Sequence, residues 1–258
     1  FGVSDYTKEL QMNLEGKNFV LTGGASGIGR ATVGTLCAAG ARVFFGDINE
    51  AGGAETETNV KADGGNTTFI PLDITSDESI ASFAATALAE TQIDGVINVA
   101  GWDIIQPFIE QTPEFWEKVI KINLMGPVKL TRAFLDPMIE RNVGKIVSVS
   151  SDAGRVGSMG ETMYAGAKGG IIAFSKSLAR EVARYRINVN CVCPGPTNTP
   201  LFNAQPERMR EALTRAIPFR RVAEPQEIAD TILFFASNRS DYLTGQVLSV
   251  SGGLTMVD

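Results

Sequence analysis

Short apolar segments alternate with longer helix-like segments along this sequence from end to end. The strand candidates are rich in β-branched residues and lie at 18–22, 42–46, 67–71, 95–98, 145–150, 187–193 and 246–250. The helix-like segments between them are 27–39, 50–62, 77–90, 113–141, 161–185 and 225–236. Strands that are apolar on both faces and joined by helices form parallel sheets covered on both sides. The sequence therefore predicts an α/β fold, a single doubly wound parallel sheet of about seven strands with helices on both faces.

The whole chain, residues 1–258, is expected to form one domain, because no linker, repeat or change of composition divides it. Its polar N-terminal stretch, 1–17, lacks the basic-then-apolar order of a secretory signal. The sequence also contains no apolar run of transmembrane length. We therefore expect a cytoplasmic protein without membrane contact. Since the first residue is Phe1 and not Met, we expect the encoded protein to begin upstream of it.

The absence of histidine is the most informative feature of the composition. It excludes every Ser-His-Asp or Cys-His mechanism and most zinc chemistry, so no metal site is expected. Any proton transfer in this chain must use a carboxylate, Lys, Tyr or Cys. The net charge of −6 argues against nucleic acid as a partner. Cys191 and Cys193 alternate in an apolar run, which favours buried strand thiols over a redox or metal site.

A glycine-rich loop follows the first predicted strand directly. Gly23, Gly27 and Gly29 allow the backbone to turn sharply into a helix. The N-terminus of that helix, with Ser26 and Ile28, can hold a pyrophosphate. The spacing departs from G-x-G-x-x-G, and a tight strand-to-helix turn without a ligand would need similar glycines. The loop alone therefore leaves both interpretations open.

Residues after the next three strands favour a dinucleotide as the ligand. Asp47 can accept hydrogen bonds from the adenosine ribose hydroxyls and would repel a 2′-phosphate. Its successor, Ile48, is not basic, so the predicted cofactor is NAD and not NADP. Both Asp47 and Asp73 could instead cap the helices that follow them. The predicted nucleotide contacts in these segments are Asp47, Ile48, Asp73, Ile74, Asn98, Ala100 and Gly101.

A tyrosine and a lysine four residues apart provide the proton-transfer group that the composition requires. Tyr164 and Lys168 lie in a predicted helix, where positions i and i+4 share a face. A free Tyr has a pKa of about 10, and a nearby cation lowers it by favouring the phenolate. The sequence therefore predicts that Tyr164 acts as an acid or base near neutral pH, close to the strand that ends in Ser151.

Taken in register, these motifs resemble the short-chain dehydrogenase/reductase family. The resemblance covers about 14–256, and its motifs are the glycine loop, 98–101, Asn123, Ser151, Tyr164-x-x-x-Lys168 and 194–199. It implies a Rossmann-type sheet and hydride transfer between an alcohol and the cofactor. The sequence departs from the usual family pattern at Val99, Thr197 and Ser251, none of which is a catalytic position.

The resemblance also implies roles for individual residues. Tyr164 would take the proton from the substrate hydroxyl, and Ser151 would hydrogen-bond the same oxygen. Lys168 would bind the nicotinamide ribose, and Asn123 would hold a water in the proton path. The nicotinamide would be lined by Pro194, Gly195, Thr197 and Thr199. Members of the family usually assemble as homotetramers through the helices that begin near 113 and 161.

Four segments suggest a substrate class, because they are similar to the 2-hydroxycyclohexanecarboxyl-CoA dehydrogenases. These segments are 101–108, 151–158, 193–197 and 244–256. We therefore expect an NAD-dependent dehydrogenase of a cyclic secondary alcohol, an alicyclic β-hydroxyacyl-CoA being one form of it. A free alicyclic or terpene alcohol is the alternative. The substrate would lie under a lid at about 199–218, against Trp102, Asp152, Arg155, Met159, Leu201 and Phe202.

Two further functions are compatible with the same motifs. A 3-oxoacyl-carrier-protein reductase would use NADP and a basic surface, and both Asp47 and the net charge of −6 argue against it. A non-catalytic NAD sensor could dispense with Tyr164 and Lys168, so their presence argues for an enzyme. A CoA substrate would need cations to bind its phosphates. Arginines in and after the lid region could supply them, or could instead be paired with glutamates. The arginines in question are Arg208, Arg210, Arg215, Arg220 and Arg221.

Overall fold

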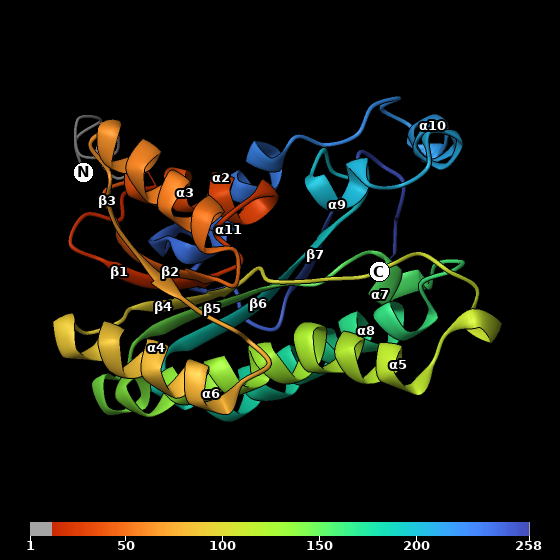
Figure 1. Cartoon of the computed structure of the whole chain (residues 1–258). Helices are drawn as coiled ribbons and strands as arrows, with labels where there is room; N and C mark the ends of the chain where they lie inside the picture. Colours follow the sequence, from red (N-terminus) through yellow and green to blue (C-terminus); the bar gives the residue numbers. More distant parts are fainter. Residues whose placement is uncertain (1–11, 258) are drawn as a thin grey trace, which may run out of the picture.

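The structure is a computed structural model and describes residues 12–257. Its sheet has the order β3-β2-β1-β4-β5-β6-β7, and all neighbouring strands are parallel (Figure 1). The strands are β1 (Asn18–Thr22), β2 (Arg42–Asp47), β3 (Asn66–Pro71), β4 (Gly95–Asn98), β5 (Gly144–Val149), β6 (Ile187–Pro194) and β7 (Val247–Val250). The doubly wound sheet predicted from the sequence is confirmed. Its winding reverses between β1 and β4, where folds of this type bind ligands.

Consecutive residues in the central strands are buried on opposite faces of the sheet. Val20 of β1 and Phe44 of β2 belong to one core cluster, together with side chains of α4, α6 and α8. Their neighbours Leu21 and Phe45 belong to a second cluster, with side chains of α2 and α11. All four side chains are at most 1% exposed. This burial explains why the strands are apolar at nearly every position and not at alternate ones.

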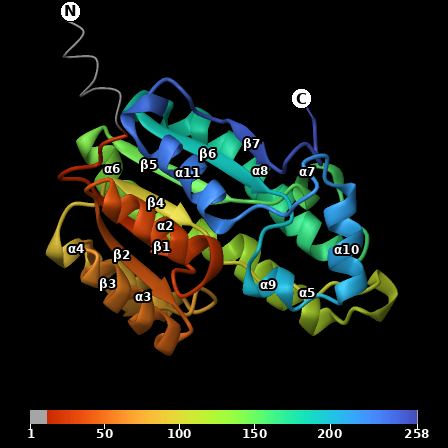
Figure 2. The same cartoon turned by 90° about the horizontal axis from the view of Figure 1, so that it is seen from above.

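Helices cover both faces of the sheet (Figure 1). One layer contains α2 (Gly27–Ala38), α3 (Glu50–Ala62) and α11 (Pro225–Ala236), and the other contains α4 (Asp77–Glu90), α5 (Pro113–Ile120), α6 (Gly126–Arg141) and α8 (Thr162–Val182). Three further helices lie beyond one end of the sheet (Figure 2): α7 (Ala153–Val156), α9 (Pro200–Asn203) and α10 (Glu207–Ala216). Single 3-10 turns occur at Phe108–Glu110, Ala183–Tyr185 and Asn238–Ser240.

The helix predicted over 113–141 is present with these limits, but a π-helical turn in its middle, η2 (Lys121–Met125), joins α5 to α6. Asn123 lies in this turn and is fully buried. Its side-chain amide donates to the backbone oxygen of Val119 at 3.0 Å and to that of Trp102 at 2.7 Å. The turn thus aims a helix residue at the loop after β4. The sequence of a helix-like segment does not reveal such a local change of pitch.

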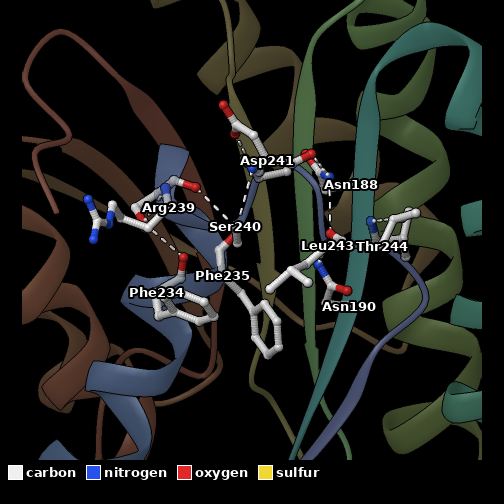
Figure 3. A network of polar contacts seen from close by, with 12 residues as sticks. Asn188, Asn190, Phe234, Phe235, Arg239, Ser240, Asp241, Leu243 and Thr244 are labelled. Atoms are coloured by element: carbon white, nitrogen blue, oxygen red, sulfur yellow. Dashed lines mark hydrogen bonds and ion pairs between the residues drawn. The ribbon is translucent and has the colours of Figure 1, made fainter. Parts of the chain in front are cut away.

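Two asparagines of β6 hold the chain at the amino end of the sheet (Figure 3). Asn190 donates to the backbone oxygen of Leu243 at 2.9 Å and accepts from the backbone N–H of Gln246 at 3.0 Å. Asn188 donates to the backbone oxygens of Leu243 and Asp241. These bonds fix the segment that leads into β7, on the side of the sheet away from the ligand-binding edge.

Two expectations from composition concern features outside that edge. Cys191 and Cys193 are free thiols, fully buried in β6, as the alternating pattern predicted. Among residues 12–257, none of the helices combines the length and the apolar character needed to cross a bilayer. Most of the polar N-terminal stretch, 1–17, lies outside the described residues.

Candidate active site

A cavity of about 1110 Å³ lies at the carboxyl ends of the central strands. One half is bounded by the glycine loop and the residues that follow β2, β3 and β4. The other half is bounded by the residues after β5 and β6, by the start of α8, and by α9 and α10. The cavity therefore occupies the switch point of the sheet, where the topology places a ligand site.

The glycine loop is built so that the first turn of α2 faces this cavity. Gly23 and Gly27 have φ angles of 79° and 50°, which residues with a side chain rarely adopt. A Cβ atom on Gly29 would lie 1.9 Å from the backbone oxygen of Gly23, so only glycine fits there. The N-cap residue Ser26 makes no side-chain cap, which leaves the first N–H groups of α2 without a side-chain acceptor. This arrangement fits the pyrophosphate of a dinucleotide.

Asp47 lies at the end of β2, half-buried beside the glycine loop. Its carboxylate accepts from the backbone N–H of Ala25 at 3.0 Å and from that of Asn49 at 2.9 Å. Arg30 lies on the same side, but its guanidinium is held by the backbone oxygen of Ala25 and by Glu55, each at 2.8 Å. Ile48, the next residue along, is 75% exposed. A carboxylate without an available cation at this position fits the adenosine ribose of NAD.

Tyr164, Lys168 and Ser151 meet at the floor of the cavity, close to the end of β5. The ammonium of Lys168 lies 5.6 Å from the centre of the Tyr164 ring and donates to the backbone oxygen of Val149 at 2.9 Å. Ser151 is close enough to Tyr164 to lower the pKa of its phenol, and its hydroxyl oxygen accepts from the backbone N–H of Ala153 at 3.1 Å. A Cβ atom on Gly101 would lie 3.4 Å from the Lys168 ammonium, so a glycine keeps this floor open.

The protonation of this cluster differs from the sequence-based expectation. Burial raises the pKa of Tyr164, and the carboxylates of Glu161 and Asp103 raise it further, against the hydrogen bond with Ser151. Burial lowers the pKa of Lys168 to about 8. The pKa of the phenol is therefore not lowered as the sequence predicted, because burial and the two carboxylates raise it in the protein alone. Tyr164 is held as a neutral phenol, the form that can donate a proton.

Asn123 does not line the cavity that Ser151, Tyr164 and Lys168 line. Its side-chain oxygen accepts from the backbone N–H of Trp102 at 3.1 Å, and both of its N–H groups are used by Trp102 and Val119. The side chain therefore clamps the loop that follows β4. If Asn123 holds a water as expected, it must bind the water through the remaining lone pair of its side-chain oxygen or through its backbone.

The structure brings most of the predicted site residues to the cavity wall. Those that line it are Gly23, Ser26, Gly27, Ile28, Gly29, Asp47, Ile48, Asp73, Ile74, Ala100, Gly101, Trp102, Ser151, Asp152, Tyr164, Lys168, Pro194, Gly195, Thr197, Thr199, Leu201 and Phe202. Some of them also have structural partners. Asp73 accepts from the backbone N–H of Thr75 at 2.8 Å, and Asp152 accepts from the hydroxyl of Ser249 at 2.7 Å.

Three other predicted residues are not brought to the wall. Asn98 is 2% exposed, and its amide donates to the hydroxyls of Thr131 and Ser148, so it ties β4 to its neighbours. Arg155 donates to the backbone oxygen of Val257 at 2.8 Å, on the C-terminal tail. Met159 is 97% exposed. Their places in the sequence motifs did not reveal which way their side chains point.

The sequence analysis did not identify several residues in the half of the cavity that is bounded by α8, α9 and α10, called the substrate half below. The carboxyl groups of Asp103 and Glu161 both line the cavity there. A carboxylate inside the apolar run 102–105 and another three residues before Tyr164 were the available signals. Further apolar lining comes from Ile105, Leu213 and Leu254.

Known proteins resemble this chain over nearly its whole length. A family model described as enoyl-(acyl carrier protein) reductase matches residues 23–255. The 3-oxoacyl-[acyl-carrier-protein] reductase of Thermotoga maritima is 37% identical over 95% of this chain and 100% of its own length. The acetoacetyl-CoA reductase of Synechocystis sp. is 39% identical over 94% of this chain and 98% of its own length. A 3-oxoacyl-[acyl-carrier protein] reductase of Brucella melitensis, solved with bound NAD, superposes with a TM-score of 0.89 and 32% identity, over 97% of this chain and 95% of that one.

The fold, the site and these matches define an oxidoreductase that uses a nicotinamide cofactor. The chain belongs to the short-chain dehydrogenase/reductase family.

Proposed function

We propose that the protein interconverts a 3-oxoacyl thioester and the corresponding 3-hydroxyacyl thioester, with NAD as its preferred cofactor. The observation that carries the proposal is the meeting of Ser151, Tyr164 and Lys168 at the floor of a cavity whose wall also contains apolar side chains. The names of the relatives from Thermotoga maritima and Synechocystis sp. support a thioester with a ketone at its β-carbon. They favour the 3-oxoacyl reductase alternative over the alicyclic substrate that the sequence suggested.

In the proposed reaction the bound cofactor supplies or accepts a hydride. Tyr164 donates its phenolic proton to the ketone oxygen as that oxygen becomes a hydroxyl, and it takes the proton back in the reverse direction. Ser151 hydrogen-bonds the same oxygen and fixes its position. Lys168 holds the cofactor ribose and offers a positive charge to any phenolate that forms. Asn123 keeps the loop after β4 in place beside these groups.

The choice of NAD over NADP rests on the end of β2. A 2′-phosphate bound at the end of β2 would be repelled by the Asp47 carboxylate, and Arg30 is already paired with Glu55. The other predicted nucleotide contacts, apart from Asn98, also line the cavity. Both aspartates, Asp47 and Asp73, also orient their own loops through backbone N–H groups. These bonds are compatible with nucleotide binding, because each carboxylate has further lone pairs.

We further propose that 199–218 closes over the substrate as a lid. Helix α9 contributes Leu201 and Phe202 to the cavity wall, and α10 contributes Leu213. The arginines of this region do not line the cavity. Arg215 pairs with Glu211 at 3.4 Å and Arg221 with Glu227 at 2.6 Å. These pairs weigh against a dedicated phosphate site for CoA on the lid.

A substrate panel tests the proposed function directly. Acetoacetyl-CoA, 2-oxocyclohexanecarboxyl-CoA, cyclohexanone and a terpene ketone would each be offered with NADH and with NADPH. We expect turnover of acetoacetyl-CoA with NADH at the highest kcat/KM. The second candidate, an alicyclic substrate, is favoured by the broad apolar wall at Trp102 and Ile105, and it predicts preference for the cyclic compounds. A preference for NADPH would contradict the argument from Asp47.

A further inference from the structure

Two carboxyl groups in the substrate half of the cavity have no role in the reaction described above. Asp103 lies in the loop after β4, and Glu161 lies at the start of α8. Asp103 is 6% exposed, and its Oδ2 atom is buried without a hydrogen-bond partner among the described residues. Its carboxylate is otherwise held by the backbone N–H of Ile104. A buried carboxylate oxygen without a partner is costly in a folded protein, so Asp103 brings a poorly compensated negative charge to the cavity wall.

The backbone holds together the two loops that carry these carboxyl groups. The N–H group of Gln106 donates to the backbone oxygen of Gly160 at 3.0 Å, which joins the loop of Asp103 to the residue before Glu161. Gly160 has a φ angle of 82°, and a Cβ atom there would lie 2.8 Å from the side chain of Ile105. The loops can pack this closely only with a glycine at that position. The proximity of the two loops is therefore a built feature of the fold.

Charged groups around the pair do not neutralise it. Neither carboxyl group forms an ion pair with any residue between 12 and 257. The nearby lysines are engaged elsewhere: Lys118 of α5 lies 3.8 Å over the Trp102 ring, and Lys168 donates to Val149. The remaining titratable groups that line this part of the cavity are Glu114, Glu117, Lys121, Asp152 and Tyr164.

Burial and the charge of Glu161 both affect the protonation of Asp103. Burial and the neighbouring Glu161 raise the pKa of Asp103 to about 6, and burial also raises the pKa of Glu161. Above that pH the pair presents negative charge to the substrate. A negative, poorly solvated surface attracts hydrogen-bond donors and repels carboxylates.

We propose that Asp103 and Glu161 form a substrate subsite that binds a hydrogen-bond donor near the reacting carbon and excludes substrates with a free carboxylate there. The inference rests on the proposed function and gives it a specificity: the thioester is accepted, and the free 3-oxo acid is rejected. The donor is an amide N–H of the thiol arm or a hydroxyl group of the acyl part. Both present the same chemistry to the two carboxyl residues of the cavity wall.

Ratios of kcat/KM for matched substrates, measured at pH 7.5, test the subsite. The first pair is the 3-oxobutanoyl thioester of N-acetylcysteamine against that of butanethiol, which lacks the amide. The second pair is methyl 3-oxobutanoate against 3-oxobutanoate. The third is cyclohexane-1,2-diol against cyclohexanol, with NAD. The third pair tests the subsite even if thioesters are not substrates. A failure to convert thioesters would contradict the proposed function but not the subsite.

The variants are Asp103→Leu, Asp103→Asn and Glu161→Gln, with Glu114→Gln as the control. Glu114 lines the same cavity but is exposed, so its substitution removes one charge outside the subsite. We expect the wild-type protein to prefer the donor-bearing member of the first or third pair by about tenfold. Asp103→Leu should abolish this preference. In Asp103→Asn and Glu161→Gln, free 3-oxobutanoate should gain about tenfold in kcat/KM relative to its methyl ester.

The pattern of ratios decides between a subsite and a structural role. Preference in the first pair assigns the donor to the amide, and preference in the third assigns it to a hydroxyl. A structural role would lower kcat/KM for both members of each pair alike, so unchanged ratios in Asp103→Asn and Glu161→Gln would overturn the proposal. These two variants are nearly isosteric with the native residues and decide the question if Asp103→Leu does not fold.

Discussion

The phenol of Tyr164 lies among groups that keep it protonated in the protein without ligand. Burial and two carboxylates raise its pKa, while the Lys168 ammonium is turned toward the backbone oxygen of Val149. A phenol in this state carries the proton that the reduction of a ketone needs. Because the best general acid has a pKa near the working pH, the raised pKa also makes it a weak donor until a nearby charge or hydrogen bond lowers that pKa.

Removing the phenolic hydroxyl tests this role. We expect Tyr164→Phe to lower kcat by about 10²- to 10⁴-fold, the usual contribution of a positioned acid or base. Binding of NADH, followed by its fluorescence, should change little, because Tyr164 contributes only part of the cofactor wall. Tyr242→Phe is the matched control, since Tyr242 is fully exposed. Retention of kcat in Tyr164→Phe would exclude Tyr164 as the acid.

The carboxylate of Asp47 provides a second test at the residue scale. Asp47→Asn removes the charge but keeps an oxygen that can accept from the N–H of Ala25, so the glycine loop should stay in place. We expect the ratio of kcat/KM for NADP to that for NAD to rise by about tenfold, because a like-charge contact with the 2′-phosphate is lost. The matched control is Asp63→Asn, at the C-terminal end of α3. An unchanged ratio would mean that Asp47 serves only the loop.

At the scale of elements, the sequence predicted the sheet well because each strand is buried on both faces. The predicted limits of β1 and β4 agree with the structure, and the other strands differ by a residue or two. The π-helical turn around Asn123 could not be predicted, since it depends on a contact with the distant loop at Trp102. For the same reason the sequence placed Tyr164 and Lys168 on one face but did not predict that Asp103 lies near them.

The asparagines of β6 offer a prediction about how β7 is held. Asn190 is 1% exposed and joins both the backbone oxygen of Leu243 and the N–H of Gln246 (Figure 3). We expect Asn190→Ala to lower the free energy of unfolding by about 2 kcal/mol, because two backbone groups lose buried partners. Urea denaturation measures the change. Asn188→Ala, at a more exposed position of the same strand, should cost less; the reverse order would contradict this view of the network.

At the scale of the whole molecule, assembly is a prediction that one chain does not test. The resemblance implied a homotetramer built through the helices that begin near 113 and 161, which correspond to α5 with α6 and to α8. We expect light scattering to give about four times the 27.5 kDa of one chain. A monomer at micromolar concentration would exclude this arrangement.

The stability of the molecule should also depend on the carboxyl pair. The pKa of Asp103 is raised from 3.8 to about 6 in the folded chain, so the folded state holds a proton that the unfolded chain releases within this range. Stability from this group is present below about pH 4 and is lost as the pH rises through about 6. We therefore expect Asp103→Asn to raise the free energy of unfolding at pH 7.5 by about 2 kcal/mol, and by much less at pH 4.

Urea unfolding at both pH values measures this effect, and Glu114→Gln gives a control of opposite sign. The pKa of Glu114 is lowered by its own backbone N–H and by Thr112, so its charge stabilises the folded state above about pH 4.5, and its loss should not stabilise the protein at pH 7.5. If Asp103→Asn were less stable than wild type at pH 7.5, the carboxylate would have a structural partner. If it is more stable but less selective, the fold keeps a destabilising charge that only a substrate can satisfy.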